Sequence, residues 1–389
     1  MRTISDRPEL VNHVRHLSWC NHNARWGPSY PAWESGQVEL LPWQKLLYRL
    51  PLQSQFRNQV YEASFTRDDR WEFMALFIAL PRLESYHAVD DGSKSTLQWF
   101  MMIPFQSGVN SDFSWSDRLS RLREVHMHGL SRATLQNGEL PQLIFSHVHT
   151  LTLGHFVGCH MPLNAVPSST VKELRLLDGT FSATEYAHLL RCFSRLETIR
   201  HIINIPRPHT HGHRLYLHDW CLALRLHRHT LKSFQFICPL HVWYCCNGQT
   251  PGTPIRSFKD FPKLEHLEIF DVAFMSELDE AFDDETCCQS LADFLPPSIK
   301  HVSLTALQAP NHFAINLLAD VLNRKAEFVH LNSVTLRCQK PEDNFSDGHL
   351  NHVRGMSKIA GLRFEVEQVK PFEVSDCCRN ELGEIVTPG

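Results

Sequence analysis

The 389-residue sequence lacks long apolar runs. Nowhere do about 18 consecutive apolar residues occur, and residues 1–8 contain no apolar stretch of the signal-peptide kind. We therefore expect neither a membrane-spanning segment nor secretion, and we place the protein in the cytoplasm or the nucleus. Twelve cysteines without a secretory signal are typical of reduced thiols, and we interpret most of them as small buried apolar residues.

An excess of basic charge is also lacking. Lys and Arg number 38 against 42 Asp and Glu, so the net charge is 38 − 42 = −4, which argues against a nucleic-acid partner. Glycine is scarce at 17, and no phosphate loop, dinucleotide fingerprint or Gly-x-Ser-x-Gly motif occurs. We expect no enzyme activity and no cofactor.

No Cys-x-x-Cys pair occurs, although histidine is abundant at 25 residues. Several histidines gather between residues 209 and 241, close to cysteines at 221, 238, 245 and 246. A zinc-binding protein is therefore an alternative hypothesis. The run His209-x-His211-x-His213 follows two prolines in a predicted loop, where alternate side chains need not converge, so we favour a polar loop without metal.

A six-residue pattern recurs along the chain: apolar, polar, polar, apolar, polar, apolar. Nine complete copies occupy residues 14–19, 83–88, 122–127, 148–153, 171–176, 231–236, 264–269, 299–304 and 331–336. A tenth, at 196–201, fails only at its last position, His201. Chance would produce roughly six copies in such a chain, so the spacing is the stronger argument. From residue 83 onward consecutive copies start 23 to 39 residues apart, near the length of one strand-plus-helix unit.

The alternation in each copy predicts a short strand with one buried face. Between the strands the period changes to that of an amphipathic helix, as at Tyr186, Leu189, Leu190 and Phe193, behind a capping box at Ser182 and Glu185. The same spacing starts at Trp71, Leu217 and Ala314, and residues 362–366 alternate like one last strand.

Alternating strands and helices favour a parallel sheet with right-handed crossovers. A doubly wound sheet would need strands that are apolar on both faces, whereas these keep polar residues on one side. We predict an α/β solenoid that resembles leucine-rich repeats, with the sheet on the concave face and the helices on the convex face. It forms one domain over residues 1–389: a capping strand plus insertion (1–70), repeats (71–338), and a C-terminal cap with a polar tail (339–389).

The Leu-x-x-Leu-x-Leu copies, and the segments around Leu83, Leu231 and Leu264, resemble fungal F-box proteins with divergent leucine-rich repeats. That resemblance implies a target-recognition role in a ubiquitin-ligase receptor. A helical F-box has no room before Val14, and residues 41–51 resemble one only faintly, so we do not expect a Skp-type adaptor to bind. The conserved Asn of standard repeats is matched only at Asn204.

Polar residues at the third and fifth positions of each copy should line the concave face, because side chains alternate across a sheet. Such a row is how solenoids present a binding surface, and it predicts a non-catalytic protein–protein interaction module with partners of unknown identity. The expected partner-binding residues are Glu124, His126, Glu173, Arg175, Arg200, Gln235, His266, Glu268, Ser303 and Thr335. The alternatives are an ordinary solvated sheet face and a solenoid scaffold unrelated to ubiquitin.

Overall fold

The computed structural model describes twelve stretches of the chain: residues 7–20, 80–89, 120–128, 147–154, 169–179, 181, 183–203, 217–238, 257–274, 290–306, 313–338 and 345–368. They contain one parallel sheet of eleven strands, whose spatial order is the order in the sequence. The strands are β1 (His16–Cys20), β2 (Ser85–Val89), β3 (Glu124–His128), β4 (Thr150–Gly154), β5 (Glu173–Leu177), β6 (Thr198–Ile202), β7 (Ser233–Ile237), β8 (His266–Phe270), β9 (His301–Thr305), β10 (Ser333–Cys338) and β11 (Arg363–Gln368).

The strands lie where the six-residue sequence pattern predicted them. Each of the ten copies forms a strand that begins at its third residue, including the imperfect copy at 196–201, which forms β6. The alternating residues 362–366 correspond to β11. Neighbouring strands pair so that equal positions of the pattern face each other, as Leu174 faces Ile199 and Ile199 faces Phe234.

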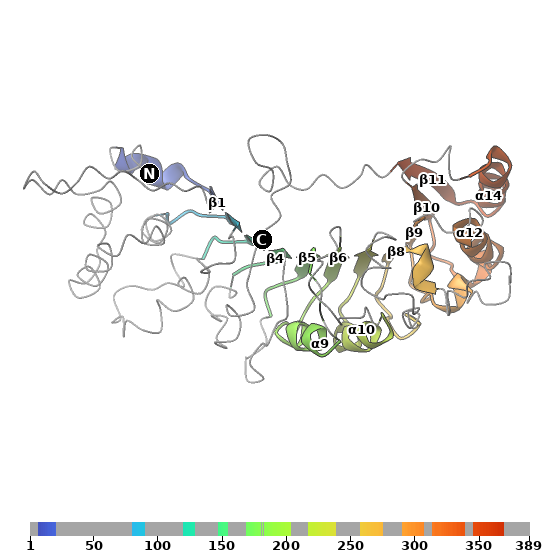
Figure 1. The fold of residues 1–389 in the computed structure, drawn as a ribbon, viewed down its shortest axis with the longest axis horizontal. Helices are drawn as coiled ribbons and strands as arrows, with labels where there is room; N and C mark the ends of the chain where they lie inside the picture. The colour runs from blue at the N-terminus through green and yellow to red at the C-terminus, as the bar shows by residue number, and fades with distance from the viewer. Residues whose placement is uncertain are drawn as a thin grey trace, which may run out of the picture.

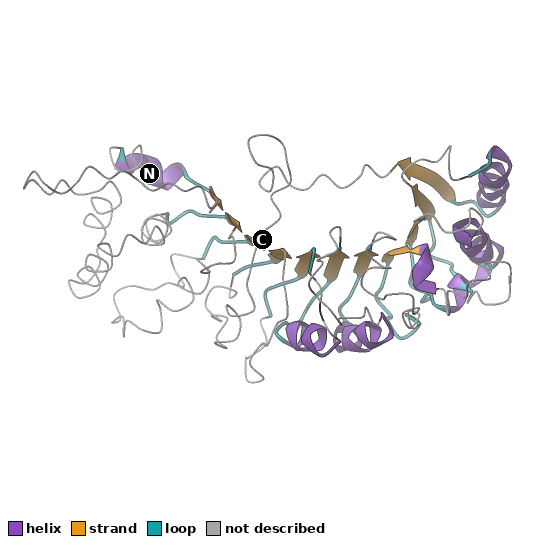
Figure 2. Ribbon diagram, in the orientation of Figure 1, coloured by secondary structure: helices purple, strands orange, loops and turns teal. Residues whose placement is uncertain are grey.

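The helices lie on one side of the sheet (Figures 1 and 2). Their bounds are α9 (Ala183–Arg191), α10 (Leu217–Leu224), α12 (Phe313–Asn323) and α14 (Asp347–Ile359), and 3₁₀ turns occur at η1 (Pro8–His13), η2 (Arg225–His227), η3 (Asp271–Phe274), η5 (Leu291–Asp293) and η6 (Lys325–Glu327). The helices predicted around Tyr186, Leu217 and Ala314 are confirmed. None of these described helices has the length and apolar composition that crossing a bilayer would need.

The core lies between the helices and the sheet. Apolar residues at the first, fourth and sixth positions of the pattern are almost fully enclosed from β3 to β10, as Leu174, Leu176 and Ile199 illustrate at 0% exposure. The helix side is wider than the strand side, so the sheet curves, and β9 to β11 turn up from the row formed by β4 to β8 (Figure 1). The structure is therefore the predicted leucine-rich-repeat-like α/β solenoid.

His201 explains how the imperfect copy still forms a strand. It occupies the sixth, core-facing position of β6 and is completely buried, stacked 4.8 Å from the ring of Trp220 and 5.9 Å from that of Tyr186. Its Nε2 donates to the carbonyl of Gly179 over 3.0 Å, which makes it the neutral tautomer with the proton on Nε2. An imidazole thus replaces the usual aliphatic side chain as a flat ring in an aromatic cluster.

The residues at the second position of the pattern join all eleven strands along one margin of the sheet. The carbonyl of Arg15 accepts hydrogen bonds from the N–H groups of both Glu84 and Ser85, and every following strand repeats this two-donor arrangement up to Lys300. We call these residues the second-position row: Arg15, Glu84, Arg123, His149, Lys172, Glu197, Lys232, Glu265, Lys300 and Asn332.

Side chains of the second-position row form ion pairs from strand to strand. Glu197 lies 2.6 Å from Lys232 and 3.7 Å from Lys172, measured from carboxylate oxygen to Nζ, and Glu265 lies 2.9 Å from Lys300. Arg15 pairs with Glu84 in the same way. Opposite charges on facing residues stabilise strand pairing, so the row favours this register.

The last helix leads into β11 through a tight C-terminal cap. Gly361 has φ +66°, the left-handed conformation, and its N–H donates to the carbonyl of Lys358 while that of Leu362 donates to Ser357 over 2.8 Å. This pair of bonds is the Schellman arrangement that ends a helix at a left-handed residue. It directs the chain straight from α14 into the edge strand.

Several sequence predictions lie outside the described residues: the insertion after β1, the helix at Trp71, the F-box-like residues 41–51, the His209–His213 run, and the polar tail from Ser375. The proposed domain limits, including the terminal caps, stay predictions.

Two glycines near the end of α14 should respond in opposite ways to alanine. Gly361→Ala forces a side chain into the left-handed region and should lower the free energy of unfolding by about 1 kcal/mol. Gly355→Ala, within the helix and with no atom inside 4 Å of the added carbon, should raise it by up to about 1 kcal/mol. Urea unfolding of both variants measures the difference, and equal shifts would contradict the cap.

Burial of His201 should make the fold sensitive to acid. Burial lowers the pKa of His201 from 6.5 to about 4, whereas the unfolded chain keeps the ordinary value. Between these pH values the unfolded state binds more protons, so the free energy of unfolding should fall as the pH falls from about 6.5 to about 4, by on the order of 3 kcal/mol. Urea midpoints measured across this window test the slope, which His201→Leu should reduce; an unchanged slope would contradict this origin.

Candidate functional site

The concave face carries polar side chains at the third and fifth positions of the strands. Burial alternates accordingly: in β5, Leu174 and Leu176 are enclosed while Glu173 and Arg175 on the other face remain partly exposed. All ten predicted partner-binding residues lie on described strands, at the positions expected to face the concave side. Their role in binding stays a prediction.

A hollow of about 680 Å³ lies on the concave face between β6 and β11. Six of the ten predicted residues line it: Arg200, Gln235, His266, Glu268, Ser303 and Thr335. The other four, Glu124, His126, Glu173 and Arg175, lie on β3 and β5 outside it. The curvature of the sheet separates these two groups of residues, because the hollow forms where β9 to β11 turn toward the preceding strands (Figure 1).

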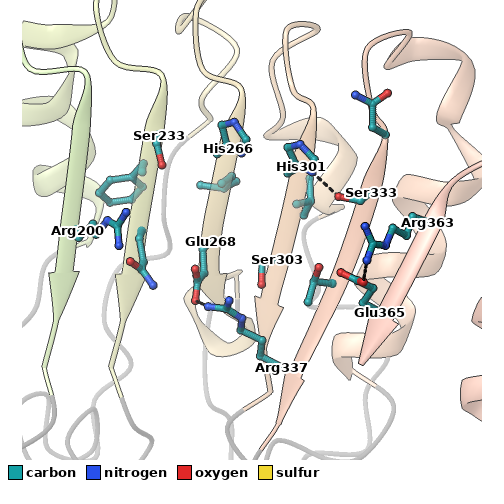
Figure 3. A pocket seen from close by; sticks show the side chains of 16 residues that line it. Arg200, Ser233, His266, Glu268, His301, Ser303, Ser333, Arg337, Arg363 and Glu365 are labelled. Carbon is teal, nitrogen blue, oxygen red and sulfur yellow. Dashed lines mark hydrogen bonds and ion pairs between the residues drawn. The ribbon is translucent and has the colours of Figure 1, made fainter. Parts of the chain in front are cut away.

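Arg337 was not among the predicted residues, yet it joins three strands of the hollow. Its Nη1 donates to Glu268 on β8 (Figure 3), and its Nε donates to Glu367 on β11 over 2.8 Å. Arg337 is the fifth residue of β10 and occupies the next alternate position after Thr335, one residue beyond the six-residue pattern. Its place on the concave face could have been found by extending the alternation by two residues.

Two imidazole rings lie stacked in the upper part of the hollow (Figure 3). The rings of His266 and His301 are 4.6 Å apart at an interplanar angle of 11°, and Nδ1 of His301 is hydrogen-bonded to Ser333 Oγ. Burial, and then the neighbouring His301, lower the pKa of His266. Protonation of His266 is therefore disfavoured, and its ring presents a neutral imidazole to the hollow near neutral pH.

The guanidinium groups of the hollow are each paired with a carboxylate. Arg200 Nε lies 3.2 Å from Glu173, which also accepts from Arg175 Nε over 2.8 Å, and Arg363 lies 2.5 Å from Glu365 on β11. With Arg337 bound to Glu268 and Glu367, each arginine of the hollow has a carboxylate partner within the protein. The groups between them are hydroxyls, an amide and imidazoles, which recognise partners by hydrogen bonds.

A second histidine pair lies on the concave face near the other end of the sheet. The rings of His87 on β2 and His126 on β3 meet edge to face with centroids 5.7 Å apart. Burial lowers the pKa of His126, and Glu124, 3.8 Å away, opposes that effect.

Within the described stretches, no group of three or more His, Cys, Asp or Glu side chains is placed to hold a metal ion. Cys221 and Cys238 are buried and form no disulfide, as expected of small apolar residues. The loop histidines of the zinc hypothesis and the adjacent cysteines at 245 and 246 lie outside the described residues.

No protein-family model matches the chain, and no curated protein matches it. Among solved structures, a Bacteroides fragilis protein determined as a structural-genomics target is similar at 10% identity with a TM-score of 0.38. The alignment covers 74% of this chain and 66% of that protein. Similarity at this level carries no argument about function.

Arg337 should stabilise the C-terminal strands more than an arginine on the helix side does. Arg337→Met leaves Glu268, whose side chain is 16% exposed, without its cation, and should lower the free energy of unfolding by about 1–2 kcal/mol. The matched control is Arg324→Met, which breaks bonds to Asp293 and Glu327, two carboxylates that are more than half exposed; it should lower the free energy of unfolding by less than Arg337→Met does. Urea unfolding compares the two, and equal losses would contradict a special role for Arg337.

Proposed function

We propose that the protein is a non-catalytic protein–protein interaction module that binds its partner in the hollow of β6 to β11. The observation that carries the proposal is the hollow itself, about 680 Å³ lined from six consecutive strands of one sheet. Strands joined by backbone hydrogen bonds hold their side chains in place, so little ordering entropy is lost when a partner docks.

The chemistry of the hollow favours a polar partner surface with little net charge. Its arginines already have carboxylate partners, so an additional charged group would have to displace a bond within the protein. Ser233, Gln235, His266 and Thr335 offer hydrogen-bond donors and acceptors on three strands, β7, β8 and β10. A peptide segment or loop rich in amides and hydroxyls matches this set.

The resemblance to fungal F-box proteins supports a finer hypothesis, in which the sheet recognises the target of a ubiquitin-ligase receptor. The repeat-like parallel sheet agrees with this resemblance at the level of architecture alone. Capture of a Skp-type adaptor with the protein would support this finer role, and its absence from the captured proteins would leave the interaction module without a ligase function.

The test is an affinity capture from extract of the cells that make the protein, followed by measurement of the dissociation constant. Ser233→Arg with Gln235→Arg places two large side chains in the hollow without removing an ion pair, and should weaken partner binding at least about tenfold. The control, Leu222→Arg with Asn316→Arg, adds the same charges to exposed positions on α10 and α12 and should bind like the unmodified protein.

Two outcomes would contradict the proposal. One is that the hollow variant and the convex-face control capture the same proteins with the same affinity. The other is that no protein is captured specifically. Circular dichroism and urea unfolding of both variants show whether the fold is retained.

A further inference from the structure

The charges of the second-position row alternate in sign except around β4. From β1 the row runs Arg15, Glu84, Arg123, and from β5 it runs Lys172, Glu197, Lys232, Glu265, Lys300. Between these two series stands His149, with Arg123 on one neighbouring strand and Lys172 on the other. An acidic residue at 149 would make the alternation continuous over nine strands, from Arg15 to Lys300.

Glu197 shows what a carboxylate does in this row. It bridges the cations of the two adjacent strands, at 3.7 Å from Lys172 and 2.6 Å from Lys232. The hydrogen bond from Lys232 lowers the pKa of Glu197, so the carboxylate is held in its charged form. Arg123 and Lys172 stand in the same relation, one strand on either side of β4, and strands two apart in a sheet are about 10 Å apart.

The surroundings of His149 are positive on both sides. Arg123 Nη1 donates to the carbonyl of His147, in the turn that leads into β4, over 3.0 Å, and Arg123 forms no ion pair with the residues that the structure describes. Burial, Arg123, Lys172 and His147, in that order, lower the pKa of His149. Glu124 and Glu173, the next residues along β3 and β5, point to the opposite, concave face, where His126 and Arg175 accompany them.

We propose that Arg123, His149 and Lys172 form a binding site for a carboxylate supplied by an acidic segment of a protein partner. The incoming carboxylate takes the place in the row that glutamate holds on β6 and β8, and it bridges Arg123 and Lys172 as Glu197 bridges its two lysines. Two cations flank the neutral imidazole, as two lysines flank Glu197. This site lies on the margin of the sheet and is independent of the hollow of β6 to β11.

The test uses the full chain and a fluorescein-labelled peptide of alternating glutamate and glycine, with the glutamine–glycine peptide as its uncharged match. At about 20 mM salt, where screening is weak, fluorescence polarisation should show binding of the glutamate peptide only. His149→Glu should weaken that binding at least about tenfold, because the carboxylate then comes from the chain itself. His149→Gln should change it less than about threefold, and Ser233→Arg with Gln235→Arg, in the hollow, should not weaken it.

The stability of His149→Glu tests the same site in the absence of any peptide. His149→Glu should raise the urea midpoint relative to His149→Gln at low salt, and the gain should shrink at about 1 M salt, where exposed ion pairs are screened.

The proposal is overturned if His149→Glu binds the glutamate peptide as tightly as the unmodified chain, or if the chain binds neither peptide. Inorganic phosphate that competes as strongly as the unlabelled glutamate peptide would overturn the assignment to a carboxylate and identify a phosphate ligand. Loss of binding in the hollow variant alone would place the acidic segment in the hollow instead.

Discussion

The structure depends on a single backbone arrangement, in which the carbonyl of each second-position residue accepts two consecutive N–H groups from the next strand. This arrangement recurs from Arg15 to Lys300 and holds the strands parallel with equal positions side by side. A slip of one residue would move every apolar side chain of a strand to the concave face. The register therefore decides at once which residues form the core, which face the concave side, and which line the margin where charges alternate.

The concave face and the core meet different physical demands. Core positions need side chains that fill space, and even His201 meets that demand as a neutral flat ring among Tyr186 and Trp220. Most concave positions stay partly exposed, and their charges pair within the sheet, as Arg337 pairs with carboxylates on both sides of its own strand. What remains for a partner in the hollow is a set of hydrogen-bonding groups with little net charge, whereas the margin at β4 keeps positive charge.

Much of the architecture could be predicted because it depends on the alternation of apolar and polar residues within short segments of the chain. The pattern at 196–201 could be accepted as a strand despite His201, because its spacing from neighbouring copies matched one repeat. The candidate site could be predicted only in part. The third- and fifth-position rule found Gln235, His266 and Ser303, but it stopped short of Arg337, and it could not separate Glu124 and Glu173 from the residues of the hollow. The roles of the described polar residues remain predictions that binding measurements decide.

The sequence by itself determined the strands, their order, the helix side and the polar side, because these follow from periods of two and 3.6 residues and from the short connections between copies. Tertiary structure alone decided where the sheet curves into a hollow, that His266 stacks on His301, and that Arg123, His149 and Lys172 become neighbours on three strands. Neighbouring residues in these two groups lie 23 to 35 positions apart in the chain, and only the register of strand pairing and the widths of the two layers bring such residues together.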